Sequence, residues 1–427
     1  MSLDGALKNG SLLVSDSGNR YKVIRLLGAG GQGEVYEVER GANRAALKWY
    51  FPKMVTLAQK HILEKLVAKG APDEAFLWPE DMITQGTGNP LGYVMKLRPP
   101  EYKGIIDMMK RRAEPSFKAL CKAAFNLTRG YQKLHTLGYS YRDISFGNVF
   151  FNPDSGNILI CDNDNVSASG DDNSSVYGTP RFMAPEIVIG NAVPSRNTDL
   201  YSLSVLLFYM FMLHHPLEGK READIKCLDI FAMTMLFGKN PLFIFDPDDD
   251  SNRPIKGYQD NAIIYWDVYP QFLRDLFTAA FTVGLSHPNR RITEYQWLYA
   301  LSNLLSQIVP CPKCGAEVFS EAGICWACRS HIDAQHILTI ERRQAVLTPD
   351  SCIYAHHILG NYDLDTVMGR VVRNPNSPDI LGIRNDTNNQ WMYTKADGTR
   401  MPVTPGKSAA IGKGVKLDFG KSIGEIT

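Results

Sequence analysis

The chain has 427 residues, of which 44% are hydrophobic and 21% are charged. This composition indicates a globular protein with room for two or three domains. The formal net charge of +1 gives no indication of a nucleic-acid or membrane partner.

Export, membrane insertion and a disulfide framework are not indicated either. Residues 1–20 contain acidic side chains and lack the apolar core of a signal peptide. The longest apolar run, residues 203–213, is shorter than the roughly 20 residues that cross a bilayer, and it predicts a buried helix. Four of the eight cysteines are clustered, which favours a metal site; the scattered ones are Cys121, Cys161, Cys227 and Cys352. We expect a cytoplasmic protein.

The first ordered element is predicted to be a hairpin with a glycine-rich tip. Residues 1–20 predict a flexible lead-in. Residues 21–27 and 34–38 predict strands around a turn in which Gly28, Gly30 and Gly33 form G-x-G-x-x-G. In Rossmann units such a turn opens a helix, whereas here it opens a strand. An ordinary glycine-rich hairpin remains an alternative at this point.

A strand, a helix, a second strand and a long helix are predicted next. Residues 45–50 predict a strand in which Lys48 follows small apolar residues. Residues 55–69 have helical spacing, with Glu64 as the only acid, although Gln59 lies nearer the turn expected to face Lys48. Residues 92–97 predict a buried strand, and residues 115–137 predict the long helix.

Five further motifs follow along the chain. Residues 149–151 and 157–161 predict a hairpin between the first two of these motifs. The motifs are Y-R-D-I-S-F-G-N at 141–148, D-N-D at 162–164, G-T-P-R-F-M-A-P-E at 178–186, D-L-Y-S-L at 199–203 and N-R-R-I-T at 289–293.

In this order, the motifs of residues 21–305 resemble those of bacterial eukaryotic-type protein kinases. The resemblance implies an α+β, bilobal kinase fold. It also implies ATP- and Mg²⁺-dependent transfer of a γ-phosphate to a protein substrate, and the G-T-P motif at Thr179 favours serine or threonine as the acceptor. The sequences of residues 139–148, Y-S-Y-R-D-I-S-F-G-N, and 160–166, I-C-D-N-D-N-V, resemble a subgroup found in tellurium-resistance-associated stress systems. There the kinase is encoded with von Willebrand-type A proteins and a metal-dependent phosphatase, which are the partners that the resemblance implies.

The resemblance also implies a role for individual residues. Lys48 would hold the α- and β-phosphates and pair with Glu64, and Asp143 would take the proton of the attacking hydroxyl. Asn148 and Asp162 would bind Mg²⁺. The residues expected to contact ATP are Gly28, Gly30, Gly33, Val35, Ala46, Lys48, Met95, Lys96 and Leu97. Arg291 would form a buried pair with Glu186.

The sequence departs from the kinase pattern at four positions: Tyr141, Ser145, Asn163 and Asp164. Asn163 and Asp164 replace the usual Phe and Gly, so we expect a more fixed magnesium loop, with Asp164 as a candidate extra ligand. A nucleotide-binding pseudokinase scaffold is therefore the alternative from a different functional class.

Arg142 is expected to pair with a phosphate on the activation loop. Ser174 and Ser175 are the preferred sites of phosphorylation. The acidic Asp171 and Asp172 are the competing partners.

Two C-x₂-C pairs follow the kinase-like region. Cys311, Cys314, Cys325 and Cys328 have the spacing of a tetrahedral Zn²⁺ site, so residues 309–332 predict a zinc ribbon. A redox function is the alternative, but a thioredoxin motif occurs once and inside a βαβ unit.

The end of the chain predicts a small all-β domain. Residues 333–360 are interpreted as a linker, and residues 361–427 as a β-sandwich or barrel. Gly369-Arg370 and residues 411–420 resemble the ends of a forkhead-associated domain. The Ser-x-x-His signature of that family is missing, so a protein-docking module is an equal alternative to phosphothreonine binding.

Overall fold

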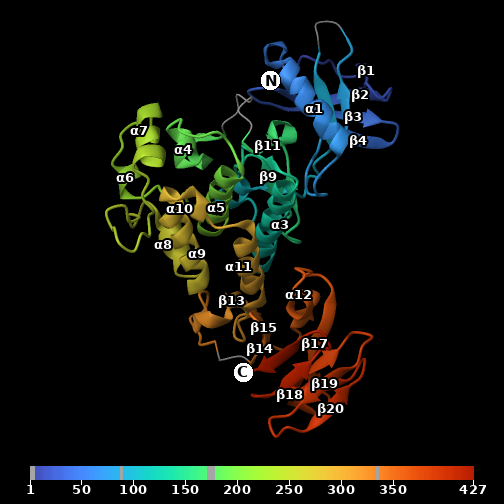
Figure 1. Cartoon of the computed structure of the whole chain (residues 1–427), viewed down its shortest axis with the longest axis vertical. Helices are drawn as coiled ribbons and strands as arrows, with labels where there is room; N and C mark the ends of the chain where they lie inside the picture. Colours follow the sequence, from blue (N-terminus) through green and yellow to red (C-terminus); the bar gives the residue numbers. More distant parts are fainter. Residues whose placement is uncertain (1–4, 87–89, 171–177, 333–335) are drawn as a thin grey trace. The chain divides into compact units, whose positions relative to one another are not determined.

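The computed structural model describes residues 5–86, 90–170, 178–332 and 336–427 (Figure 1). The chain divides into two compact units, of which the first comprises the residues up to 115, 126–262 and 277–294. The second comprises residues 116–125, 263–276 and 295–427. No helix among the described residues combines the length and apolarity needed to cross a membrane.

The first unit begins with an antiparallel sheet of six strands in the order β1-β2-β3-β4-β6-β5. The strands are β1 (Leu12–Val14), β2 (Arg20–Ala29), β3 (Gly33–Arg40), β4 (Asn43–Tyr50), β5 (Asp81–Ile83) and β6 (Gly92–Lys96). The predicted hairpin is confirmed, because Gly28 on β2 pairs with Val35 on β3. A Cβ atom at Gly33 would lie 2.2 Å from the carbonyl oxygen of Trp49, so only glycine permits this approach of β3 to β4.

The interpretation of residues 1–20 as a flexible lead-in is wrong for the part that includes β1. β1 pairs with β2, and three side chains that follow it donate to one oxygen of Asp81 on β5. The donors are Ser17 Oγ at 2.7 Å, Asn19 Nδ2 at 2.9 Å and the Tyr21 hydroxyl at 3.0 Å. The acceptor lies far along the chain, so no local pattern reveals this attachment.

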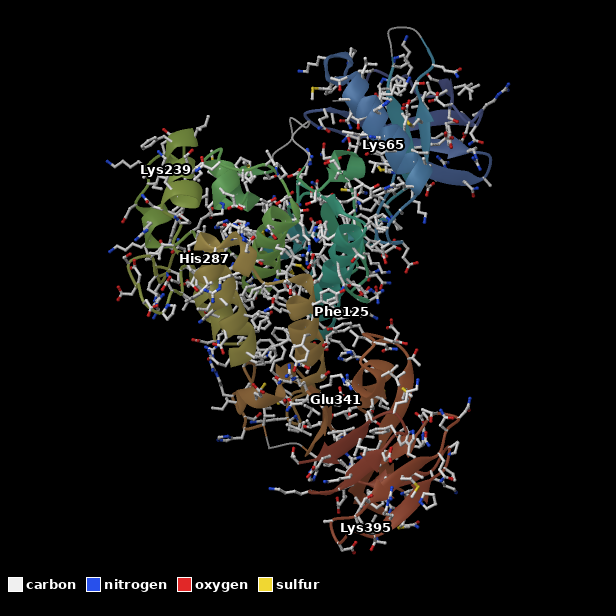
Figure 2. All side chains as sticks on the ribbon, viewed as in Figure 1. Lys65, Phe125, Lys239, His287, Glu341 and Lys395 are labelled. Carbon is white, nitrogen blue, oxygen red and sulfur yellow. The ribbon has the colours of Figure 1, made fainter. Side chains whose placement is uncertain are left out.

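Helix α1 (Leu57–Lys69) has a defined start and end. Thr56 Oγ1 accepts a hydrogen bond of 3.1 Å from the Gln59 backbone N–H, and Gly70 ends the helix at a φ of 74°. Leu63 is fully buried. Lys65, labelled in Figure 2, lies on the exposed face.

Helix α5 (Arg196–Met212) follows in the first unit, and its residues from Thr198 to Met212 are all buried. This confirms the predicted buried helix, which starts earlier than the apolar run because Ser195 caps it. The predicted hairpin is also confirmed, with β9 paired to β10. The remaining elements of this region are β7 (Lys103–Gly104), α2 (Ile105–Met109), α3 (Phe117–Thr136), β8 (Tyr139–Ser140), β9 (Val149–Phe151), β10 (Ile158–Ile160), β11 (Ser167–Ala168), α4 (Pro185–Val188), α6 (Lys220–Ala223), α7 (Ile230–Thr234), α8 (Asp260–Trp266), α9 (Gln271–Phe281), α10 (Val283–Ser286) and α11 (Glu294–Ser306).

The second unit contains a short ribbon of β12 (Ile308–Pro310) and β13 (Glu317–Phe319), which pair antiparallel. Phe117, in the first turn of α3, packs against the ribbon through Phe319 and Trp326, with ring centroids 5.3 and 6.1 Å apart. Further along α3, Phe125, which is labelled in Figure 2, packs on Tyr362 with the ring centroids 5.9 Å apart. The ribbon and the following domain are therefore joined to the start of α3 by aromatic contacts.

The second unit ends in two antiparallel sheets, ordered β15-β14-β23-β22-β19-β20 and β16-β17-β18-β21. Their shared core contains the fully or almost fully buried Leu338, Val371, Ile383, Trp391 and Leu417. The elements are β14 (His336–Ile340), β15 (Arg343–Leu347), β16 (Cys352–Tyr354), α12 (Ala355–Leu359), β17 (Val367–Asn374), β18 (Ser377–Asn385), β19 (Trp391–Thr394), β20 (Arg400–Val403), β21 (Ser408–Ala410), β22 (Lys416–Asp418) and β23 (Ile423–Ile426).

The two sheets agree with the expected all-β character of residues 361–427 but begin earlier in the chain. Leu338 on β14 pairs with Ile426 on β23, so the strands from His336 onward belong to the domain. The interpretation of 333–360 as a linker is wrong for these strands, because β14 pairs with β23 at the end of the chain, β15 pairs with β14 and β16 pairs with β17. Residues 333–335 lie outside the described part of the chain.

Candidate active site

A buried carboxylate of α5 accepts hydrogen bonds from the backbone of residues 141–148, the loop between β8 and β9. Asp199 accepts hydrogen bonds from the backbone N–H groups of Tyr141, at 2.6 Å, and Arg142, at 3.0 Å. The Tyr141 hydroxyl donates to the backbone oxygen of Cys161 at the end of β10. Arg142 has a φ of 75°, in the left-handed region that non-glycine residues rarely adopt. The expected side-chain partners of Arg142 (Asp171, Asp172, Ser174 and Ser175) lie outside the described residues.

Both carboxylate oxygens of Asp143 accept hydrogen bonds. Asn148 Nδ2 donates to Oδ2 at 3.0 Å, and also to the Asp143 backbone oxygen at 3.0 Å. Thr179 Oγ1 donates to Oδ1 at 2.7 Å. The neighbouring Gly178 has a φ of 112°, and a Cβ there would lie 2.8 Å from the Arg142 carbonyl oxygen. Glycine thus lets the two loops meet, and their side chains fix the Asp143 carboxylate in a position to accept a proton.

Lys48, buried on β4, lies opposite this loop and meets the end of β10. Its Nζ donates to Asp162 Oδ1 at 2.8 Å, to Asp164 Oδ2 at 2.8 Å and to Gln32 Oε1 at 3.0 Å. Burial alone would lower the pKa of Lys48, but the two carboxylates outweigh it and raise that pKa. The pKa of Asp162 is raised by burial and by the charge of Asp164, which Lys48 only partly offsets. A bound cation at this position would relieve the repulsion between the two carboxylates.

The predicted pair of Lys48 with Glu64 is wrong. Glu64 lies on the exposed face of α1, where it pairs with His61 at 3.1 Å. Gln59 is the α1 residue that faces the site, as its place in the helix indicated. Its Nε2 donates to the Asp164 backbone oxygen at 3.0 Å and to the Tyr50 hydroxyl at 3.3 Å.

Asp164 is not available as an extra metal ligand, contrary to expectation, because it is fully buried and its carboxylate oxygens already have partners. Oδ2 accepts from Lys48 and from the Tyr50 hydroxyl, and Oδ1 accepts from the Tyr93 hydroxyl at 3.4 Å. The sequence pattern did not indicate Tyr50 or Tyr93 as members of this site. Their only signal is the alternation that places them on the same sheet face as Lys48.

Asn163, between the two acids, is anchored to the surrounding backbone. Its side chain is completely buried, and Nδ2 donates to the carbonyl oxygens of Leu77 at 2.8 Å and Ile160 at 3.0 Å. These hydrogen bonds agree with the expectation of a fixed loop in place of an aromatic switch.

The donor set fits a magnesium ion held by Asp162 and Asn148. The backbone N–H of Cys161, next to Asp162, donates to the Asn148 carbonyl oxygen at 2.9 Å, which joins the two segments. Among the described residues, neither Oδ2 of Asp162 nor Oδ1 of Asn148 accepts a hydrogen bond. Both are hard oxygen ligands of the kind that Mg²⁺ prefers.

The residues expected to contact the adenine base lie on one face of the sheet. Val35, Ala46, Met95 and Leu97 pack in a single apolar cluster. Ala46 pairs with Met95 across β4 and β6. Lys96 is exposed at the end of β6. Ideal Cβ atoms at Gly28 and Gly30 would have no neighbour within 4 Å, so open space adjoins the hairpin tip.

The predicted pair of Arg291 and Glu186 is confirmed. The guanidinium donates to both carboxylate oxygens of Glu186 at 2.7 Å. This bidentate geometry, with Arg291 almost fully buried, ties α4 to the segment before α11.

The four clustered cysteines of the ribbon converge on one point. The sulfur atoms of Cys311, Cys314, Cys325 and Cys328 all lie within 4.8 Å of one another, and two of the pairs are 3.7 Å apart. A tetrahedron with Zn–S bonds of about 2.3 Å has sulfur atoms about 3.8 Å apart, so the site fits zinc.

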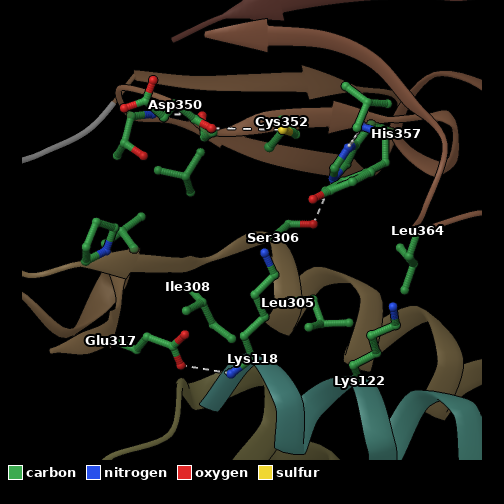
Figure 3. A pocket seen from close by; sticks show the side chains of 18 of the residues that line it. Lys118, Lys122, Leu305, Ser306, Ile308, Glu317, Asp350, Cys352, His357 and Leu364 are labelled. Carbon is green, nitrogen blue, oxygen red and sulfur yellow. Dashed lines mark hydrogen bonds between the residues drawn. The ribbon is translucent and has the colours of Figure 1, made fainter. Parts of the chain in front are cut away.

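The second unit also contains a cavity of about 690 Å³. Figure 3 shows Lys118 and Lys122 on α3 at one side of this cavity, with Cys352 and His357 at the other. His357 Nε2 lies 2.9 Å from Ser306 Oγ, and burial lowers the pKa of His357 to about 3, so the ring is neutral. These contacts define no catalytic arrangement.

Comparison with known proteins agrees with this geometry. Residues 93–276 match the family model described as protein kinase domain. The chain contains a protein kinase domain. The matched segment includes Asp143, Asn148 and Asp162, whereas Lys48 and the glycine turn precede it.

The relatives of this kinase domain include serine/threonine kinases. A probable serine/threonine-protein kinase of Zea mays is 24% identical over 48% of this chain and 33% of its own length. Protein kinase C delta type of Rattus norvegicus is 30% identical over 47% of this chain and 30% of its own length. The serine/threonine-protein kinase plk-2 of Caenorhabditis elegans is 28% identical over 28% of this chain and 19% of its own length. The chain thus spans a third or less of the length of these relatives.

Proposed function

We propose that this protein is an ATP- and Mg²⁺-dependent kinase that phosphorylates serine or threonine in a protein substrate. The observation that carries the proposal is the arrangement of Asp143. Asn148 and Thr179 hold its two oxygens, while Lys48 and Asp162 form a pair at the end of the adjoining strand. This is the set of charges that phosphoryl transfer needs, because catalysis in this class consists mainly of positioning and electrostatic stabilisation.

Each side chain has a defined task in this proposal. Mg²⁺ bound by Asp162 and Asn148 would neutralise charge on the β- and γ-phosphates. Lys48 would exchange its contact with Asp162 for the α- and β-phosphates. Asp143 would accept the proton of the substrate hydroxyl as its oxygen attacks the γ-phosphorus, while the bond from that phosphorus to the β,γ-bridging oxygen breaks and ADP leaves. Thr179 would keep the carboxylate turned toward that hydroxyl.

The experiment is incubation of the full chain with radiolabelled ATP, Mg²⁺ and a general protein substrate. Phosphate on serine or threonine that disappears in Asp143→Asn supports the proposal. Nucleotide binding without any transfer would instead support the pseudokinase scaffold, for which Ser145 in place of the usual lysine is the relevant departure.

The finer parts of the proposal concern the second unit and the partners. We propose that the four cysteines bind structural Zn²⁺ and that the two-sheet domain, which resembles forkhead-associated domains at its ends, docks proteins. The resemblance to kinases of tellurium-resistance-associated stress systems supports a von Willebrand-type A protein as substrate and a metal-dependent phosphatase as its counterpart. Phosphorylation of a co-expressed von Willebrand-type A protein by the full chain would test this extension.

A further inference from the structure

Lys48 lies between two carboxylates that belong to one loop. Asp162 and Asp164 each contact its Nζ at 2.8 Å, from positions two residues apart. In the usual kinase arrangement one of the two acids is a glutamate from a mobile helix. Here the helix α1 supplies the neutral Gln59.

Compared with that arrangement, the negative charge that pairs with Lys48 has moved from the helix, where Gln59 is neutral, to Asp164. The total charge of the two positions is unchanged. A glutamate at position 59 would add a carboxylate next to Asp164, because Gln59 Nε2 already lies 3.0 Å from the Asp164 backbone oxygen. Two like charges that contact the same Tyr50 hydroxyl in a buried site repel each other strongly. The neutral Gln59 and the acidic Asp164 are thus compatible as a pair.

The surroundings of Asp164 are built to hold a carboxylate. The side chain is completely buried, and the hydroxyls of Tyr50 and Tyr93, from β4 and β6, donate to its two oxygens. Asp162, in contrast, has a side chain that is 39% exposed and an oxygen free for a cation. The two acids therefore have separate environments.

We propose that Asp164 is the positioning residue for Lys48 and takes the role expected of a helix glutamate. This inference rests on the proposed kinase function and deepens it. Because Asp164 lies on the magnesium loop, whose Asn163 is anchored to Leu77 and Ile160, Lys48 is aligned by the same segment that carries the metal ligand Asp162. The alignment of Lys48 does not require a charged contact from α1.

The test is a charge-exchange series: Asp164→Asn, Gln59→Glu and the double variant. Three quantities are measured on the full chain: the Kd of a fluorescent ATP analogue, the KM for ATP and the thermal unfolding midpoint without nucleotide. Asp164→Asn is expected to raise the Kd and the KM by about tenfold or more, since it removes one partner of a buried charge. Gln59→Glu alone is expected to lower the unfolding midpoint, because it adds an unpaired acid.

The double variant is decisive. The charge at position 59 should replace the one lost at 164, so the double variant should recover most of the affinity and of the unfolding midpoint. Losses that simply add would overturn the proposal. So would a loss in Glu64→Gln equal to that in Asp164→Asn, because Glu64 lies on the exposed face.

Two further readouts keep the result separable from folding defects and from the proposed function. Tyr50→Phe removes a donor to Asp164 without changing charge, and it should give a smaller rise in KM for ATP than Asp164→Asn. If the wild-type chain transfers no phosphate, the proposed function fails, while the unfolding midpoints of the charge-exchange series still decide whether Asp164 pairs with Lys48. Midpoints that do not recover in the double variant would then refute the pairing.

Discussion

Thr179 donates a hydrogen bond of 2.7 Å to the Asp143 carboxylate from a loop that lies 36 residues further along the chain. Residues 141–148 and the segment around Thr179 are thereby joined at the Asp143 carboxylate. We expect Thr179→Val to lower kcat by about tenfold with little change in the KM for ATP, since one charge-assisted hydrogen bond is lost. Thr179→Ser keeps the hydroxyl and serves as the control. Equal losses in both variants would contradict the role of this hydrogen bond.

Asp143→Asn should abolish phosphotransfer while the affinity for ATP stays within a few fold. The carboxylate acts on the substrate hydroxyl and not on the nucleotide, and an amide cannot take up the proton. Transfer is measured with radiolabelled ATP, and affinity with a fluorescent analogue. Asp154→Asn, in the β9–β10 turn, is the matched control. Full autophosphorylation by Asp143→Asn would show that this residue is not the base.

Removing Glu186 should destabilise the first unit by roughly 3–5 kcal/mol, because Arg291 would remain buried without its bidentate partner. Urea unfolding of Glu186→Ala, followed by tryptophan fluorescence, provides the measurement. Arg25→Ala breaks an exposed pair with Glu37 and should change stability by about 1 kcal/mol or less. A similar effect of the two substitutions would mean that burial of the Arg291 pair adds nothing.

The buried His135 predicts a loss of stability at alkaline pH. Burial alone would lower its pKa, but hydrogen bonds to Asp199 and Glu294 outweigh burial and raise the pKa to about 8. A histidine pKa raised above the unfolded value of 6.5 contributes stability that is complete below about pH 6.5 and is lost as the pH rises through about 8. The shift corresponds to about 2 kcal/mol.

Unfolding free energies at pH 6 and pH 9 test the contribution of His135. His135→Gln should remove most of the difference between the two pH values, whereas His287→Gln, on an exposed histidine labelled in Figure 2, should retain it.

Glu294 affects stability at acidic pH. Its pKa is held at about 2, against the opposing effect of burial, by His135 and Arg196, so its contribution is lost only as the pH falls from about 4.5 through about 2. If the pH dependence of the unfolding free energy were unchanged in His135→Gln, His135 would be excluded as the source of the stability loss at alkaline pH.

The ribbon should bind one zinc ion per chain, and chelation should loosen it without unfolding the kinase domain. A ribbon with so small a core is expected to need its metal to fold, whereas the first unit has its own core. Elemental analysis gives the stoichiometry, and fluorescence of Trp326, whose indole donates to the Glu317 carbonyl oxygen, reports the ribbon locally. Cys314→Ser should lose the metal and Cys227→Ser should keep it. A metal-free chain with freely modifiable cysteines would refute the site.

The motifs that are continuous in sequence were predictable because each carries its own local geometry. The turn at Gly33, the hairpin before Asp162 and the loop around Asp143 follow from residue types that favour one backbone conformation. The partner of Lys48 did not follow in this way. A helix position relative to a strand depends on packing, so the sequence pointed to Glu64 as the only acid, although Gln59 had the better placement.

Contacts between distant segments account for the other differences. The segment that contains β1 is attached because the Asp81 carboxylate accepts hydrogen bonds from Ser17 and Asn19. Strand β14 is attached because β23 pairs with it. In both cases the stabilising partner lies far away in the sequence. Strand propensity describes packing against neighbours more than an intrinsic preference, so these pairings are not readable from composition.

The anchored Asn163 has a consequence for small-molecule inhibition. A compound that gains affinity by expelling the residue after the metal-binding aspartate needs that residue to leave an apolar recess behind. Here it would have to break the hydrogen bonds of Asn163 to Leu77 and Ile160. The Ile160 carbonyl would keep its hydrogen bond from the Leu77 N–H, but the Leu77 carbonyl would lose the Asn163 donor. An apolar group cannot satisfy that acceptor. Inhibitors of this kinase domain should therefore be sought among compounds that occupy the nucleotide site with the loop in place, or among those that bring an N–H donor of their own.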